Sequence, residues 1–185
     1  LDIHSGKRTR LTTGTKYFSP DISHDGRKIV AAEADPSGKS YLVMLDAEDG
    51  KVKEKLPNPG EYFFTYPAFS KNDDKIFSAV RSQAGQMALV AFNIADGSHQ
   101  ILVPFTYKTI AFTRVRGDFV IFTASYNRKD QVWAWDDASG QLILLTGHNT
   151  GSYEADIDLK KQELVYSRFT ADGMQLFRES TDRQQ

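Results

Sequence analysis

The sequence predicts an all-β fold: a β-propeller of four-stranded antiparallel blades, with about four blades present. Three observations support this prediction: a repeat of roughly 40–50 residues, the same order of apolar runs and turns in every repeat, and the lack of an extended helical periodicity. In each repeat, an apolar run ends in an acidic or amide residue, and a glycine follows four positions later. The four copies are Asp2 to Gly6, Asp46 to Gly50, Asn93 to Gly97 and Asp136 to Gly140.

Each complete repeat contains four short apolar runs, and we expect each run to form a strand. In the first repeat the expected strands are 19–23, 28–33, 41–46 and 52–56, with the Asp25-Gly26 pair as a hairpin signal. The strands expected in the second and third repeats are 66–70, 75–81, 87–93, 99–103, 111–115, 119–125, 131–136 and 141–145. The last repeat has three expected strands, at 153–159, 163–169 and 174–178.

The two ends of the chain each contain part of a repeat. Residues 7–12 are expected to form a lone fourth strand, and the last repeat has no fourth strand of its own. The units are therefore a partial 1–12, then 19–56, 66–103, 111–145 and 153–178, all within one propeller segment of residues 1–185. We expect this segment to be a piece of a larger propeller. Alternatively, residues 7–12 complete the last blade and close a four-bladed ring, at the lower end of the usual range of ~4–8 blades.

Composition excludes several classes of function. The 185 residues include 23 basic and 24 acidic side chains, so no concentrated basic face is expected and we predict no nucleic-acid partner. There is no cysteine, which excludes disulfides and thiolate chemistry but leaves the compartment open. No apolar run approaches the ~20 residues of a membrane span, so no membrane insertion is expected. None of the four histidines has a second ligand at a metal-binding spacing, and we predict neither metal nor cofactor.

Several short motifs have a plainer structural interpretation than a functional one. The tripeptide Ser23-His24-Asp25 contains triad residue types, but neighbours on a turn cannot adopt the geometry of a catalytic triad. Arg116-Gly117-Asp118 stands where other repeats have their first hairpin turn, and we expect a turn there too. Ser37 to Ser40 resembles the end of a phosphate-binding loop, but it lacks the upstream glycine and the following helix. No convergent catalytic group is expected, so the chain is predicted not to be an enzyme.

Large apolar residues recur at matching strand positions, as packing between blades requires. Trp133 and Trp135 lie in one strand, and we expect one to pack between blades and the other to face the neighbouring sheet. The two matching sets are Ile22, Phe69, Phe112, Ile157 and Ile29, Ile76, Phe119, Leu164.

Tyrosines recur in the linkers between repeats and define the candidate binding site. They are Tyr17, Tyr62, Tyr107 and Tyr153, spaced 45, 45 and 46 residues apart. In a propeller these linkers share one rim with the loops between second and third strands, which adds Tyr126 and Arg128. Amphipathic rings beside polar side chains suit recognition of a protein or an oligosaccharide. The alternative is that each linker tyrosine wedges the entrance of its innermost strand.

The stretch 17–30 resembles the signature of the TolB-like propeller repeat, which has Ser-Pro-Asp-Gly-Lys-Lys before its second strand. Here the sequence is Ser19-Pro20-Asp21-Ile22-Ser23-His24-Asp25-Gly26-Arg27-Lys28, so His24 replaces the proline, and later copies depart further. The endings Arg10-Leu11-Thr12 and Leu144-Leu145-Thr146 also look like the family's closing Leu-Thr. The resemblance implies a bacterial, periplasmic or envelope-associated protein, and it carries over no catalytic residue.

These observations lead to one functional prediction and one alternative. We predict a non-catalytic scaffold segment of a larger bacterial envelope protein, which binds a protein or an oligosaccharide. The alternative is an accessory propeller that gates or positions substrate for a hydrolase, peptidase or lyase site outside this chain.

Overall fold

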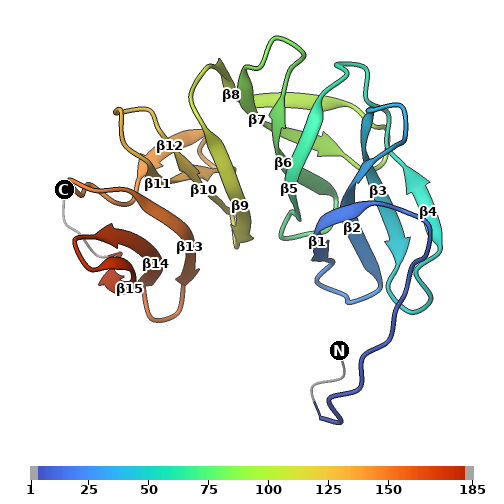
Figure 1. Cartoon of the computed structure of the whole chain (residues 1–185), viewed down its shortest axis with the longest axis horizontal. Helices are drawn as coiled ribbons and strands as arrows, with labels where there is room; N and C mark the ends of the chain where they lie inside the picture. The colour runs from blue at the N-terminus through green and yellow to red at the C-terminus, as the bar shows by residue number, and fades with distance from the viewer. Residues whose placement is uncertain (1–3, 182–185) are drawn as a thin grey trace.

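The computed structural model describes residues 4–181, in which all regular secondary structure is β-strand (Figure 1). Fifteen strands within this range form four antiparallel sheets, arranged one after another along an arc. Three sheets have four strands, and the last has three. The predicted propeller fold is confirmed, and each sheet is referred to below as a blade.

The blades follow the order of the repeats. Blade 1 contains β1 (Tyr17–Ile22), β2 (Lys28–Ala34), β3 (Ser40–Asp46) and β4 (Val52–Lys55). Blade 2 contains β5 (Phe63–Phe69), β6 (Lys75–Arg81), β7 (Met87–Asn93) and β8 (His99–Thr106). Blade 3 contains β9 (Ile110–Arg116), β10 (Phe119–Ala124), β11 (Gln131–Asp136) and β12 (Gln141–Leu144). Blade 4 contains β13 (Ser152–Asp158), β14 (Glu163–Thr170) and β15 (Gly173–Ser180).

The first strands of the blades line the concave side of the arc. Spatial order equals chain order in every sheet, so β1, β5, β9 and β13 each form one edge. These four strands contact one another in succession, from β1 to β5, β9 and β13 (Figure 1). The concave wall is therefore built from segments more than forty residues apart in sequence.

Each first strand contains a bulge at the same place. In β1, pairing with β2 breaks between Phe18 and Asp21, and β5, β9 and β13 show the equivalent break. Two residues there face one residue of the neighbouring strand, which is the definition of a β-bulge. The first bulge residue has a φ of 50° to 57°, a conformation that costs side-chain-bearing residues free energy and persists only where the surroundings hold it. These residues are Ser19, Tyr66, Phe112 and Glu154.

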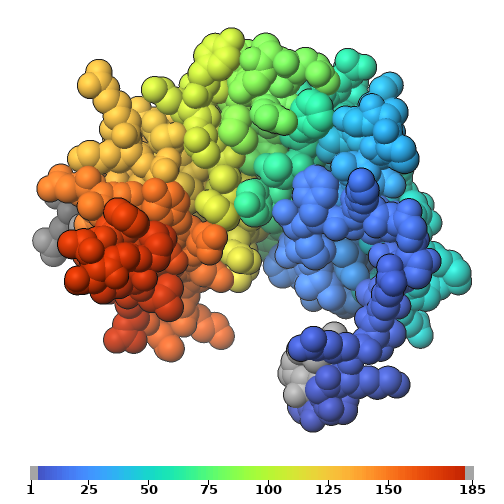
Figure 2. Space-filling view, viewed as in Figure 1, coloured from blue at the N-terminus to red at the C-terminus, as the bar shows by residue number. Residues whose placement is uncertain are grey.

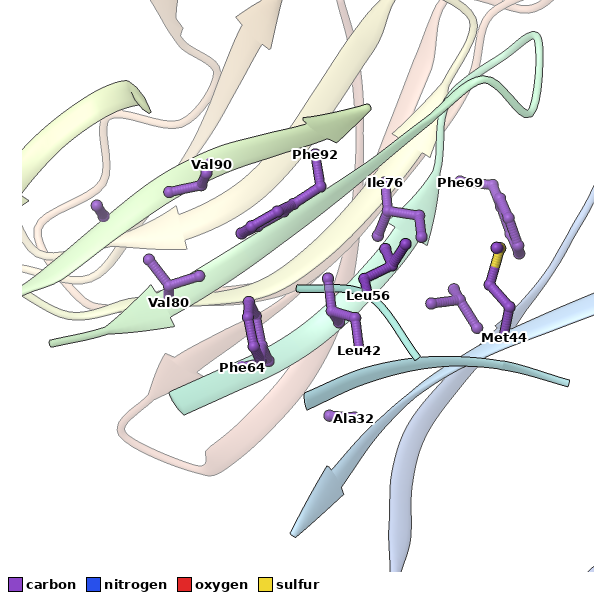
Figure 3. Packing of buried hydrophobic residues seen from close by; sticks show 12 residues of the cluster. Ala32, Leu42, Met44, Leu56, Phe64, Phe69, Ile76, Val80, Val90 and Phe92 are labelled. Carbon is purple, nitrogen blue, oxygen red and sulfur yellow. The ribbon is translucent and has the colours of Figure 1, made fainter. Parts of the chain in front are cut away.

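Apolar side chains fill the spaces between neighbouring blades. One cluster, between blades 1 and 2, includes Leu42 and Met44 from β3 packed against Phe64, Ile76 and Phe92 (Figure 3). Similar clusters lie between blades 2 and 3 and between blades 3 and 4. Each large side chain buried there contributes about 1.5–3 kcal/mol of transfer free energy. Because a single blade exposes both faces of its sheet, neighbouring blades supply most of this burial.

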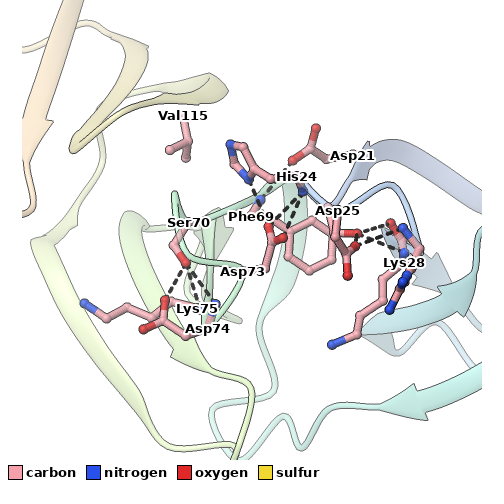
Figure 4. Close-up of polar contacts among 12 residues, drawn as sticks. Asp21, His24, Asp25, Lys28, Phe69, Ser70, Asp73, Asp74, Lys75 and Val115 are labelled. Atoms are coloured by element: carbon pink, nitrogen blue, oxygen red, sulfur yellow. Dashed lines mark hydrogen bonds and ion pairs between the residues drawn. The ribbon is translucent and has the colours of Figure 1, made fainter.

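Polar contacts join the blades at the turns after the first strands. The amide nitrogen and Nδ1 of His24 both lie about 2.9 Å from the carboxylate of Asp73 in blade 2 (Figure 4). Ser23 instead donates to Asp25 at 2.7 Å, so this tripeptide forms a turn and an inter-blade contact rather than a triad. The following junctions have the ion pairs Lys71–Asp118 at 3.1 Å and Arg116–Asp156 at 2.7 Å.

The prediction of a strand at residues 7–12 is wrong, since these residues pair with no sheet in the described structure. They lie instead beside blade 1: a Cβ atom on Gly50 would come within 2.5 Å of the Leu11 carbonyl oxygen. A fourth strand needs a third strand to pair with, and the nearest described third strand, β3, already pairs with β4. Asp2 and Ile3, which belong to the first copy of the repeat, lie outside the described residues.

Two details of the packing prediction are also corrected. In blade 3 the residues equivalent to Ile22 and Ile29 are Val115 and Val120, not Phe112 and Phe119. The reason is the turn between β9 and β10, Gly117-Asp118, which is shorter than the turn in blade 1. Trp133 and Trp135 do not face opposite sides. Residues two apart in a strand share one face, and both pack against the cluster between blades 2 and 3.

Candidate functional site

A cavity of about 750 Å³ opens on the concave side, where the bulges lie. It is lined by the bulged segments of β1, β5 and β9, together with Glu154 of β13. In Figure 2 this hollowed side lies between the first blade, coloured blue, and the last blade, coloured red. All four first bulge residues lie on the cavity wall. The cavity is thus the place where all four blades contribute side chains.

The cavity wall combines aromatic and charged groups. The rings of Tyr66 and Phe112 lie 5.0 Å apart with their planes at 46°, which joins blades 2 and 3 at the wall. Asp21 accepts a hydrogen bond from the backbone N–H of Phe69 at 2.9 Å, so its position is set by the neighbouring blade. Arg114, on the same wall, is exposed. Aromatic faces beside fixed charges are the composition typical of protein-binding hot spots.

One buried hydroxyl at the wall has no partner within the protein. Thr113 follows the bulge residue Phe112 in β9, and its Oγ1 atom is buried without a hydrogen bond. Buried polar atoms are nearly always satisfied. Because this atom is itself buried, a molecule in the cavity could reach it only after the wall repacks.

The structure places the linker tyrosines in different environments. Tyr62 packs against Phe105 and the ring of His99, with centroid distances of 5.5 and 5.9 Å. Tyr153 and Tyr62 each cover the glycine two positions earlier, Gly151 and Gly60, where a Cβ atom would collide with the ring. These two tyrosines thus pack at the entrance of their innermost strands, as the alternative interpretation states.

Tyr17 is half-buried, and burial together with Glu33 raises its pKa. Burial, together with Asp130, likewise raises the pKa of Tyr153. Tyr107 differs from the other three, because 76% of its surface is exposed. The rim therefore offers one fully accessible tyrosine in the linkers, and three that are partly enclosed.

Tyr126 and Arg128 differ although both lie in the loop between β10 and β11. The ring of Tyr126 packs edge-on against Trp133 at 5.2 Å, and burial raises the pKa of Tyr126 to about 12. Arg128 is exposed and has a φ of 62°. Of the pair, only Arg128 has a side chain that a partner can reach without repacking.

A polar cluster in blade 4 escaped the sequence analysis. Tyr166 is fully buried, donates to Glu179 at 2.6 Å and lies 2.5 Å from Nε2 of His148. Arg168 contacts Nδ1 of the same imidazole at 3.2 Å. Since a guanidinium can only donate, Nδ1 accepts and the neutral ring carries its proton on Nε2, facing Glu179. The cluster fixes the linker before β13 against β14 and β15, away from the concave cavity.

The central cavity also escaped the sequence analysis, although one signal was present. Pro20 and Pro67 stand at the second bulge position of β1 and β5, in the middle of otherwise regular strands. Proline inside a strand is confined to edges and bulges. Blades 3 and 4 have Thr113 and Ala155 at this position, so the signal is absent there.

Two further properties concern residues 4–181 as a whole. No helix in this range is long and apolar enough to cross a membrane. Nor do three or more His, Asp or Glu side chains in the range gather in a group that could hold a metal ion.

The chain has the TolB-like β-propeller fold. No protein-family model matches the sequence, and no curated protein matches it. Among solved structures, TolB from Acinetobacter baumannii superposes with a TM-score of 0.75 at 14% identity, covering 94% of this chain and 43% of that one. The likeness establishes the fold, and the chain spans less than half the length of that TolB.

Two enzymes contain similar propellers. A puromycin-hydrolyzing peptidase from Mycobacterium tuberculosis has a TM-score of 0.73 at 14% identity, covering 95% of this chain and 29% of that one. An oligogalacturonate lyase in complex with manganese has a TM-score of 0.69 at 12% identity, covering 93% of this chain and 53% of that one. The same fold thus occurs within two enzymes of different activity, and fold alone does not assign an activity.

Proposed function

We propose that this chain is a non-catalytic binding segment of a bacterial envelope protein and that it holds a partner protein at the concave cavity. One observation supports this proposal most strongly: four bulges at equivalent positions direct four different residues to one wall. The scaffold repeats while the residues displayed do not, which is the arrangement expected when a rigid fold carries a specific binding surface.

The exposed rim is the second proposed contact surface. Of the residues predicted there, Tyr107 and Arg128 are accessible, whereas Tyr17, Tyr62, Tyr126 and Tyr153 are partly or largely enclosed. An oligosaccharide partner remains a prediction from the sequence. The envelope location is likewise proposed, by analogy with the TolB fold.

The two surfaces can be separated with matched double variants. Partners would be captured from an envelope extract on the purified chain, identified, and then titrated against Tyr66→Ala/Phe112→Ala and against Tyr107→Ala/Arg128→Ala. We expect the cavity variant to weaken binding by about 1–3 kcal/mol, the range of interface anchors, and the rim variant to have the smaller effect. Loss of binding with the rim variant alone would place the binding site on the rim instead of the cavity. Unchanged binding with both variants would contradict both proposed contact surfaces.

An accessory role beside a catalytic domain is the second candidate function, favoured by the propeller of the peptidase described above. Both candidates predict that the isolated chain has no turnover of its own. Hydrolysis or elimination by purified protein, abolished by one substitution within residues 4–181, would contradict both.

A further inference from the structure

A second cavity, of about 320 Å³, lies at the junction of blades 1 and 2 and is called the junction pocket below. The β2–β3 loop, the linker between β4 and β5 and the β6–β7 loop each supply part of its wall, beside the start of β5. No residue lines both this pocket and the concave cavity. Its volume is at the small end of the ~300–1,000 Å³ range of ligand sites, which favours one small molecule. The residues that give the pocket its chemistry are Lys39, Ser40, Asn58, Glu61, Phe63 and Gln83.

Hydrogen bonds within the protein hold the linker at the pocket in place. The side-chain amide of Asn58 donates from Nδ2 to the carbonyl oxygens of Ser40 and Tyr62, both at 2.9 Å, and its Oδ1 accepts the N–H of Tyr62 at 3.0 Å. Prolines on both sides of Asn58 restrict the backbone further. Ser40 is buried, and its hydroxyl accepts the N–H of Phe64 at 3.1 Å. This part of the wall is therefore formed without a ligand.

Glu61 has a backbone conformation that its surroundings impose. Its φ of 47° lies in the left-handed region, which costs a residue with a side chain free energy. Its N–H donates to the carbonyl oxygen of Asn58 at 3.2 Å, and its own carbonyl oxygen accepts a hydrogen bond from Nε2 of Gln83 at 3.0 Å. Glycine adopts this conformation without the cost. Strain of this kind is concentrated at functional positions, so the carboxylate of Glu61 requires an explanation beyond the fold.

Two opposite charges line the junction pocket without pairing. Lys39 and Glu61 are both exposed, and neither forms an ion pair with the other or with any residue that the structure describes. Gln83 adds a further acceptor, because its Nε2 donates to Glu61 and its Oε1 is left to accept. The pocket thus offers acceptors to a cation and a donor to an anion.

Phe63 supplies an apolar part of the wall. It is partly exposed, and the guanidinium carbon of Arg81 lies 5.1 Å from the centre of its ring. This cation–π contact helps to fix the ring. A fixed aromatic ring beside polar groups suits a ligand that carries an apolar group next to its charges.

We propose that the junction pocket binds the zwitterionic head of a free α-amino acid with an apolar side chain. The ligand's ammonium group donates to the carboxylate of Glu61 and to Oε1 of Gln83. Its carboxylate accepts from Nζ of Lys39, and its side chain lies against Phe63. A ligand with a single charge would leave Lys39 or Glu61 without a partner, whereas a zwitterion engages both through charge-assisted hydrogen bonds. This site goes beyond the proposed protein-binding function, and either one can fail without the other.

A titration with L-leucine, followed by amide NMR of the full chain, tests the location of the site. At a pH of about 6.5, where α-amino groups are charged, we expect saturable shifts at Lys39, Glu61 and Gln83. The amides of Tyr66 and Phe112 in the concave cavity should stay unchanged. Saturable shifts confined to other residues, or no saturable shift at all, would contradict the proposal.

Two derivatives of the same amino acid test the need for both charges. N-acetyl-L-leucine retains only the carboxylate, and L-leucine amide retains only the ammonium group. Each should bind at least about tenfold more weakly than L-leucine, because one charge-assisted hydrogen bond is lost. Equal binding of all three compounds would contradict a zwitterion site. Undiminished binding of the amide alone would overturn the free amino acid in favour of the N-terminus of a peptide.

Matched variants separate the pocket from general surface charge. Glu61→Gln and Lys39→Met should each weaken L-leucine binding at least about tenfold, because each removes one charged contact. The controls are Glu54→Gln and Lys108→Met, at exposed positions outside the pocket. Equal losses in variants and controls would indicate non-specific attraction and would contradict the proposal.

Glu61→Gly distinguishes ligand binding from a structural role. Because glycine adopts a positive φ without steric cost, the midpoint of urea denaturation should stay close to that of the unmodified chain. L-leucine binding should be lost. A lower midpoint with unchanged binding would show that Glu61 serves the fold alone, and it would overturn the proposal.

Discussion

The outward faces of blade 1 and blade 4 terminate the same arc of blades in different ways. On blade 1, Lys55 forms an ion pair with Glu33 at 2.7 Å and lies 3.7 Å from the ring centroid of Tyr41, on the face that also bears Ala31 and Val43. Both small apolar residues are 1% exposed. On blade 4, the corresponding outward face leaves Leu176 and its neighbours accessible.

The difference teaches that the outward face of a blade can be covered by side chains of that same blade. Repeat proteins require a polar outer surface at their ends, because each unit otherwise exposes the face that neighbours bury. In blade 1, a long cationic side chain covers apolar surface with its methylene groups and keeps its charge in water. Blade 4 has no equivalent cover among the described residues, so Leu176 and its apolar neighbours remain accessible.

The largest expected effect contrasts a covered position with its uncovered equivalent. Leu89→Ala removes a side chain that is completely buried between blades, and we expect it to lower the free energy of unfolding by about 2–5 kcal/mol. Leu176→Ala, at the equivalent position of blade 4, should change it by about 0.5 kcal/mol or less in dilute protein. Urea denaturation of both variants measures the contrast. Equal losses in dilute solution would mean that the face of blade 4 is already covered.

We expect a smaller loss in the free energy of unfolding when the hydroxyl of Thr146, just after the last strand of blade 3, is removed. Thr146→Val keeps the shape of the side chain but removes both hydrogen bonds, to Val132 and to Gln131, and should cost about 1–3 kcal/mol. Thr12→Val is the matched control, since Thr12 belongs to no sheet in the single chain. Chemical denaturation at low protein concentration compares the two. A large loss for Thr12→Val under these conditions would show that residues 7–12 are paired within one chain.

Lys55, which covers apolar surface on blade 1, should contribute less to the free energy of unfolding. Lys55→Ala removes a partly exposed ion pair and a cation–π contact, each worth at most about 1 kcal/mol at such sites. We also expect the variant to expose apolar surface on blade 1, which binding of a hydrophobic dye would report. Lys51→Ala is the control, because its ion pair with Asp49 lies in the turn before β4. Equal dye binding by the two variants would contradict a covering role for Lys55.

Acid should loosen blade 1 before blade 4. Hydrogen bonds from Ser23 and Ser37, together with backbone N–H groups, lower the pKa of Asp25 and the pKa of Asp35. Hydrogen bonds from Lys53 and Lys51 lower the pKa of Asp46 and the pKa of Asp49 in the same way. A carboxyl with a lowered folded-state pKa stabilises the fold above the unfolded value of about 3.9. That stabilisation is lost as the pH falls through the lower pKa that the carboxyl group has in the folded state.

In blade 4 only Asp158 shows this lowering among the described residues. Amide resonances of blade 1 should therefore weaken first in a titration from pH 6 towards pH 3. Simultaneous loss in the two blades would indicate a single cooperative unit and would remove this difference between the ends.

The strands were well predicted because turns mark their ends clearly. The expected bounds of β6, β7 and β11 match the structure, since each is an apolar run between polar turns. Residues 7–12 were misassigned because their pattern is that of a strand, while strand formation requires a partner edge. The sequence pattern shows that a segment can form a strand, but the strand forms only where the edge of another strand is available for pairing.

The candidate site was harder to predict than the fold. A bulge reverses the alternation of inward and outward side chains, so counting by two along β5 assigns Tyr66 to the wrong environment. Tyrosines at regular spacing looked like one surface, but Tyr62 and Tyr153 pack on their own glycines. Side-chain exposure depends on how closely neighbouring blades pack, and the spacing of tyrosines in the sequence contains no information about that packing.

The bulges have a consequence for how this protein can change over evolutionary time. Deleting the codon of one bulge residue would leave the outer three strands of that blade in register and return the first strand to regular alternation. Every side chain on one side of the deletion would then exchange faces. A single in-frame deletion could thus replace several cavity residues of one blade at once, while the other three blades keep theirs. Recognition in such an arc of blades can diverge blade by blade, in steps larger than point mutation allows.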